Sequence, residues 1–138
     1  EIERVTGRSI PEVFAHEGEA AFRQLEREAT LRLVGVGPLV LAPGGGWLET
    51  GGNLEALGPA VTRVYLAVSP AVAAARLGAG AGGRPLLAGG EPENRLEEIL
   101  ARRERLYVQA NHTVSTDSLS PAEVASIIVA LASRGTGG

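Results

Sequence analysis

Short apolar runs alternate along this chain with longer segments in which apolar residues recur at helical spacing. The runs lie at residues 39–42, 62–68 and 112–115, and they predict strands, the first two of them buried. The segments with helical spacing cover residues 19–33, 70–77, 92–111 and 121–131. This alternation predicts a parallel α/β sheet.

Several helix ends have local signals of their own. Ser9 with Glu12 and Ser120 with Glu123 both form the pattern of a capping box, so a helix is expected to begin at each. The first of these helices is expected to end at Gly18. Farther on, glycines at 51 and 52 with Asn53 predict the cap of a short helix, and Trp47, the only tryptophan, is expected to cover the core.

The predicted helix 19–33 carries an arginine beside its apolar stripe. The stripe consists of Phe22, Leu25, Ala29 and Leu33. Arg23 flanks it and lies within one helical turn of both Glu19 and Glu26. Such an arginine can be a plain helix salt bridge, or an anion ligand that its two carboxylates keep in one orientation.

A second arginine falls inside an apolar stripe. In the predicted helix 92–111, Arg103 projects from the middle of the stripe formed by Leu96, Ile99, Leu100, Tyr107 and Ala110. A guanidinium does not lose its proton, so burial without a partner costs several kcal/mol and an anion should meet it. The anion could belong to a ligand or to a glutamate such as Glu26.

Three consecutive glycines follow the first predicted strand. Gly44, Gly45 and Gly46 lie where a strand of a parallel sheet would end, and ligands bind at that edge of open α/β sheets. Backbone N–H groups left uncovered by glycine can donate to a small polar substrate or an anion. The alternative is an ordinary turn from strand to helix.

Residues 78–90 are rich in glycine and contain Arg84. The pattern G-x-G-x-x-G at 78, 80 and 83 follows a helix, whereas a dinucleotide-binding fingerprint follows a strand, so we exclude it as a cofactor motif. A segment flanked by glycines with one arginine is typical of a lid that closes onto a ligand. It could equally be a surface loop.

Composition narrows the chemistry. The 138 residues suit one domain, and a formal charge of −3 gives no general attraction to nucleic acid. All thirteen cations are arginine, and Asp117 is the single aspartate. Without lysine there is no P-loop and no Schiff-base enzyme. The absence of cysteine and of any run long enough to span a membrane favours a soluble cytoplasmic protein.

Taken together, these motifs resemble those of the shikimate kinase family across nearly the whole chain. The matching residues near the beginning are Ile2, Glu3, Thr6, Gly7, Ser9, Ile10, Val13, Phe14, Gly18, Glu19, Phe22, Arg23 and Glu26. The family's glycine triplet matches residues 44–46, its Arg-Pro-Leu-Leu lid matches 84–87, and its Arg-x-x-Leu-Tyr matches 103–107.

The resemblance implies a fold, a reaction and a set of binding residues. It implies a three-layer α/β/α parallel sheet of the P-loop nucleoside-monophosphate-kinase type, with a lid at about 78–90. The reaction is transfer of the ATP γ-phosphoryl group, with Mg²⁺, to the 3-hydroxyl of shikimate in aromatic amino acid biosynthesis. Arg23 and Arg103 would bind the shikimate carboxylate, Gly44, Gly45 and Gly46 its ring hydroxyls, and Arg84 the nucleotide phosphates, with Glu26 orienting Arg23.

The chain departs from the family pattern at its beginning. The match starts after the family's first strand, P-loop, helix and Asp-x-Asp segment, and a basic residue expected near the adenine at 118–120 is missing. The 138 residues alone are therefore expected to be inactive and unstable, whereas the intact protein is expected to be a monomeric kinase. The alternatives are a shikimate-binding module without catalysis and a related P-loop kinase for another small polyol or acid.

Overall fold

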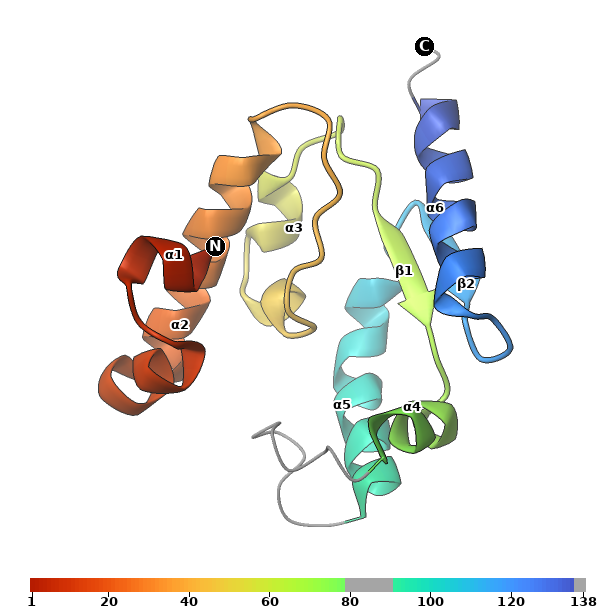
Figure 1. Cartoon of the computed structure of the whole chain (residues 1–138), viewed down its shortest axis with the longest axis horizontal. Coiled ribbons are helices and arrows are strands. Elements are labelled where there is room, and N and C mark those ends of the chain that lie inside the picture. The colour runs from red at the N-terminus through yellow and green to blue at the C-terminus, as the bar shows by residue number, and fades with distance from the viewer. Residues whose placement is uncertain (79–90, 136–138) are drawn as a thin grey trace. The chain divides into compact units, whose positions relative to one another are not determined.

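The computed structural model describes residues 1–78 and 91–135, in two compact units divided between residues 61 and 62 (Figure 1). The first unit contains α1 (Ile2–Thr6), α2 (Ile10–Val34), the 3₁₀ turn η1 (Trp47–Glu49) and α3 (Asn53–Ala56). The second contains β1 (Val64–Ala67), α4 (Pro70–Leu77), α5 (Pro92–Tyr107), β2 (His112–Ser115) and α6 (Pro121–Gly135). The predicted lid beyond residue 78, with Arg84, lies outside the described residues.

Helix α2 begins at the predicted capping box. The Ser9 side chain accepts from the Glu12 backbone N–H, and the Glu12 carboxylate accepts from the Ser9 backbone N–H. Gly18 has φ 81° and ψ 176°, so it interrupts the helical conformation inside α2. The two helices expected on either side of Gly18 are thus joined across a kink.

The buried strand expected at residues 39–42 is wrong. The segment has no regular secondary structure, it pairs with no strand among the described residues, and Val40 is 78% exposed. The backbone N–H and C=O groups of an apolar run can form strand hydrogen bonds only where a neighbouring strand pairs with it. Here that neighbour is not among the described residues, so the run stays outside the sheet.

The first unit packs around α2. Helix α1 and the η1 turn both contact α2, and α3 contacts η1. Val13 is fully buried and Trp47 is 2% exposed, as the sequence led us to expect for the tryptophan. The rings of Phe14 and Phe22 lie 4.5 Å apart between centroids, one on each side of the Gly18 kink. The aromatic pair therefore ties the two parts of α2 together.

The second unit is built on a parallel strand pair, as predicted, but the strand expected at 62–68 is shorter and only partly buried, since β1 covers Val64–Ala67 and Leu66 is 42% exposed. Strands β1 and β2 pair in the register Val64↔His112 to Ala67↔Ser115 (Figure 1). Helix α4 packs on α5, and Tyr107 at the end of α5 lies 5.1 Å from Tyr65 of β1 between ring centroids. Helix α5 ends at Tyr107, four residues before the predicted end at 111.

Arg76 of α4 links this helix to the turn after β2. Its guanidinium donates to the Thr116 carbonyl and hydroxyl and to the Asp117 carbonyl, while the Asp117 carboxylate accepts from the Ser69 N–H at 2.8 Å. Both ends of α4 are thus attached to the same turn. Within the described residues, no helix has the length and apolarity needed to cross a membrane.

Candidate functional site

The candidate site in the first unit is organised by the Glu26 carboxylate. Glu26 is 6% exposed, although it is ionisable and lies on α2. One carboxylate oxygen, Oε2, accepts from Arg23 Nη1 at 2.8 Å, and the other, Oε1, accepts from the Gly44 backbone N–H at 3.1 Å. One buried carboxylate therefore holds an arginine on one side and the glycine triplet on the other.

Arg23 is held in a defined orientation by three neighbours. Besides Glu26, its guanidinium donates to Glu19 at 3.3 Å and lies 5.4 Å from the centroid of the Phe22 ring. Its side chain remains 18% exposed, whereas that of Glu26 is 8% exposed. The predicted arrangement of an arginine between two carboxylates is confirmed. A partly exposed guanidinium with a fixed plane is suited to bind a carboxylate in a bidentate manner.

Gly44 lies so close to Glu26 that a larger residue would require the Glu26 carboxylate to move. A Cβ atom at position 44 would lie 2.3 Å from Glu26 Oε1, which is shorter than any normal contact. Immediately after the triplet, the Trp47 N–H donates to the Gly44 carbonyl at 2.9 Å and closes a turn. The triplet is thus a tight turn next to a buried carboxylate, with Gly44 and Gly45 exposed and Gly46 buried.

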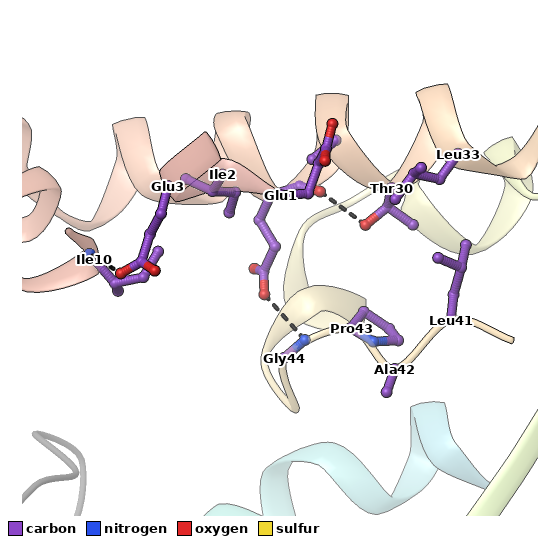
Figure 2. A pocket seen from close by; sticks show the side chains of 12 residues that line it. Glu1, Ile2, Glu3, Ile10, Thr30, Leu33, Leu41, Ala42, Pro43 and Gly44 are labelled. Atoms are coloured by element: carbon purple, nitrogen blue, oxygen red, sulfur yellow. Dashed lines mark hydrogen bonds between the residues drawn. The ribbon is translucent and has the colours of Figure 1, made fainter. Parts of the chain in front are cut away.

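A pocket of about 280 Å³ lies beside this carboxylate in the first unit. Figure 2 shows Leu41, Ala42, Pro43 and Gly44 along one side, and Ile2 and Glu3 of α1 with Thr30 and Leu33 of α2 along the others. Thr30 Oγ1 donates to the Glu26 carbonyl at 2.8 Å. Glu1, Glu3 and Glu26 line the pocket together with apolar residues.

One further polar residue of this unit was missed by the sequence analysis. Asn53 was expected to cap a short helix, but its side chain is fully buried. Its Nδ2 donates to the Trp47 carbonyl at 2.6 Å, and its Oδ1 accepts from the Arg27 guanidinium. No local spacing signals this contact, because Arg27 and Asn53 are separated by 26 residues.

Arg103 belongs to the second unit. It is 6% exposed and is the buried residue of α5, so its predicted place within the apolar stripe is confirmed. The structure brings Arg23, Glu26 and Gly44 together in the first unit. Arg103 lies in the second unit, so the structure does not test whether it joins this group. Arg84 lies outside the described residues.

The family resemblance of the sequence implies a Mg²⁺ site. No group of three or more histidine, cysteine, aspartate or glutamate side chains is arranged to hold a metal ion within residues 1–78 and 91–135. The sequence also contains no lysine to contact nucleotide phosphates. We therefore assign no described residue to the metal.

Comparison with known proteins gives a consistent result. The family model "Shikimate kinase" matches residues 1–132. A shikimate kinase of Rhodococcus erythropolis is 39% identical over 130 residues, which make up 94% of this chain and 76% of that protein. One from Thermus thermophilus is 42% identical over 131 residues, or 93% of this chain and 70% of that protein.

Solved structures agree with the sequence matches. Shikimate kinase from Acinetobacter baumannii in complex with shikimate superposes with a TM-score of 0.86 at 33% identity, covering 99% of this chain and 76% of that one. The enzyme from Bacteroides thetaiotaomicron gives a TM-score of 0.80 at 29% identity, covering 94% and 76%. The α/β fold of the P-loop kinases is therefore confirmed, and the chain belongs to the shikimate kinase family.

Proposed function

We propose that the protein phosphorylates the 3-hydroxyl of shikimate with ATP, giving shikimate 3-phosphate and ADP. The observation that carries the proposal is the double hydrogen bonding of the Glu26 carboxylate to Arg23 and to the Gly44 N–H. This contact places a fixed cation next to a glycine-rich backbone. A small acid with several hydroxyl groups needs both features, one for its carboxylate and one for its ring.

The arginines have the clearest expected roles. Arg23, oriented by Glu26, binds the shikimate carboxylate together with Arg103, and Gly44, Gly45 and Gly46 contact the ring hydroxyls. Arg103 is the buried arginine of α5, as its position in the apolar stripe predicted. Held at its carboxylate and its ring, the substrate presents one hydroxyl in a fixed position, and positioning supplies much of the catalysis in phosphoryl transfer.

The nucleotide side of the reaction rests on the family resemblance. Arg84 of the lid is proposed to close over the ATP phosphates and to neutralise charge as the γ-phosphoryl group moves. ATP and Mg²⁺ are required by this proposal, although no described residue is assigned to the metal. Shikimate is the proposed small-molecule partner, and the protein is proposed to act as a cytoplasmic monomer in aromatic amino acid biosynthesis.

The decisive experiment is an assay of ADP release by the complete protein encoded by the gene, with ATP, Mg²⁺ and shikimate. Turnover should require shikimate. Arg23→Gln should weaken shikimate binding by about 2–5 kcal/mol, the range for truncating one side of a buried charge pair. Arg32→Gln is the matched control, because Arg32 is an exposed arginine on the same helix.

Three results would overturn the proposal. One is ADP release that does not depend on shikimate. Another is a preference for a different acid or polyol, which would favour a related kinase. The third is shikimate binding without turnover, in a complete protein that also binds ATP, which would favour a binding module.

A further inference from the structure

A cluster next to the proposed shikimate site has no role in the function described so far. It consists of Arg27, Asn53 and the Trp47 carbonyl, and we call it the Asn53 clamp. The Asn53 side chain is 0% exposed and makes both of its contacts inside the unit, to the Trp47 carbonyl and to Arg27. The Asn53 backbone N–H also donates to the Thr50 carbonyl at 3.2 Å.

The clamp and Glu26 hold the two ends of one turn. Glu26 accepts from the N–H of Gly44, where the turn begins, and Asn53 donates to the carbonyl of Trp47, where it ends. Both attachments lead to α2, because Glu26 and Arg27 are adjacent residues of that helix. The glycine triplet therefore lies between two hydrogen-bonded anchors, Glu26 of α2 and Asn53 of α3, and Asn53 is in turn held by Arg27 of α2.

Each anchor is costly to remove. The Asn53 amide is fully buried, so loss of the Trp47 carbonyl would leave it without a replacement from water. The Trp47 carbonyl would keep only the longer hydrogen bond from the Thr50 N–H, at 3.4 Å. The contact of Asn53 with Arg27 is assisted by the charge of the guanidinium, and such hydrogen bonds are about twice as strong as neutral ones. This arrangement fixes the backbone of the turn more firmly than the Gly44 contact alone.

We propose that Asn53 and Arg27 are positioning residues for the substrate: they hold the backbone of Gly44, Gly45 and Gly46 in the conformation that binds the ring hydroxyls. The inference rests on the proposed function, since it assigns the triplet to shikimate. Neither side chain touches the substrate. Both act through the Trp47 carbonyl, and backbone donors give specificity only when their directions are fixed.

The test uses three variants of the complete protein. Asn53→Asp keeps an acceptor for Arg27 but replaces the amide that donates to the Trp47 carbonyl. Arg27→Gln removes the cation and is the milder change, because it leaves Asn53 in place. Arg32→Gln is the control for loss of one arginine from α2.

Two measurements separate positioning from general stability. The first is the KM for shikimate against the KM for ATP: Asn53→Asp and Arg27→Gln should raise the former about tenfold, corresponding to about 1.4 kcal/mol, and leave the latter unchanged. The second is acrylamide quenching of tryptophan emission without ligand. Trp47 is the only tryptophan of the 138 residues and is 2% exposed, so both variants should increase quenching of its emission and the control should not.

The outcomes distinguish this inference from the proposed function. If the unmodified protein shows no turnover that depends on shikimate, the proposed function fails, and quenching still tests the clamp by itself. Unchanged quenching in both variants overturns the clamp. Increased quenching with an unchanged shikimate KM, or with equal loss for both substrates, overturns the positioning role. If Asn53→Asp does not fold, Arg27→Gln alone decides between these results.

Discussion

Gly44 is the residue at which the site is most sensitive to a small change. Gly44→Ala would place a methyl group 2.3 Å from Glu26 Oε1, and that oxygen cannot move without leaving the Gly44 N–H. We expect the carboxylate to turn away and to release Arg23. Shikimate affinity should fall by about 1–3 kcal/mol, the usual range for overpacking, as measured by calorimetry on the complete protein.

Gly51→Ala is the control for this substitution. Gly51 is exposed, and an added Cβ atom there meets nothing within 4 Å. It should bind shikimate as the unmodified protein does. Unchanged affinity in Gly44→Ala would contradict the structural role assigned to the Glu26 carboxylate.

At this scale, the sequence predicts contacts within a helix and misses those between distant segments. The spacing of Arg23 and Glu26 on one helix was enough to predict their pairing, and the apolar stripe was enough to predict the burial of Arg103. Asn53 was missed because its partners, Arg27 and the Trp47 carbonyl, are brought to it only by folding. Nothing in the local sequence around a polar residue in a predicted turn indicates that its side chain will be buried.

The kink at Gly18 is the feature of α2 that a single substitution tests best. A φ of 81° with a ψ of 176° is essentially restricted to glycine. Gly18→Ala should therefore destabilise the complete protein by about 1–3 kcal/mol in chemical denaturation. A continuous helix would also separate Phe14 from Phe22, whose rings meet across the kink.

Gly35→Ala provides the comparison. Gly35 has φ −86° and ψ −4°, an ordinary right-handed conformation, and an added Cβ atom meets nothing within 4 Å. The change should be neutral or stabilising by up to about 1 kcal/mol. Equal stability of the two alanine variants would mean that the kink is not required.

The helices and strands were predicted correctly where a few neighbouring residues determine them. The prediction failed where a strand needed a second strand to pair with. Both capping boxes form as expected, and β2 has its predicted bounds, because these patterns are complete within a few residues. Residues 39–42 carry an equally strong apolar run but form no strand. Apolar residues show that a segment could be a strand, whereas pairing decides whether it is one.

For the whole molecule, carboxylates that accept hydrogen bonds at helix N-caps contribute to the way stability responds to acid. The pKa of Glu12 is lowered chiefly by the Ser9 hydroxyl, that of Glu123 by the Ser120 hydroxyl, and that of Asp117 by the backbone N–H of Ser69. A lowered pKa means that folding favours the ionised form. The stabilisation is complete above the unfolded pKa, about 4 for these groups, and is lost as the pH falls through the lower folded values.

We therefore expect the Tm to be nearly constant from about pH 7 to 5 and to fall below about pH 4. The double variant Glu12→Gln and Glu123→Gln should lower the Tm at pH 7 and flatten its decrease with acid. Glu55→Gln, a change at an exposed glutamate of α3, should leave the profile as it is. A double variant with an unaltered pH profile would refute the assignment of acid sensitivity to the capping boxes.

The two arginines of the proposed shikimate site belong to different units, so their cooperation is tested on the whole molecule. If Arg23 and Arg103 bind one carboxylate, Arg103→Ala should weaken shikimate binding by about 2–5 kcal/mol. The loss in the double variant with Arg23→Ala should differ from the sum of the single losses, because residues that share a partner are not additive. Full shikimate affinity in Arg103→Ala, by calorimetry, would exclude its role.

The contacts of Gly44 with Glu26 and of Asn53 with Arg27 also limit which insertions and deletions the segment between them can accept. Gly44 contacts Glu26, and Asn53 contacts Arg27, the next residue of α2. An inserted or deleted residue between Gly44 and Asn53 would therefore shift one of these contacts away from its partner. The stretch from Gly35 to Val40 is exposed and begins after α2 has ended. Length variation among homologues, and any peptide tag grafted internally, should therefore be accommodated in the exposed stretch and excluded from the anchored one.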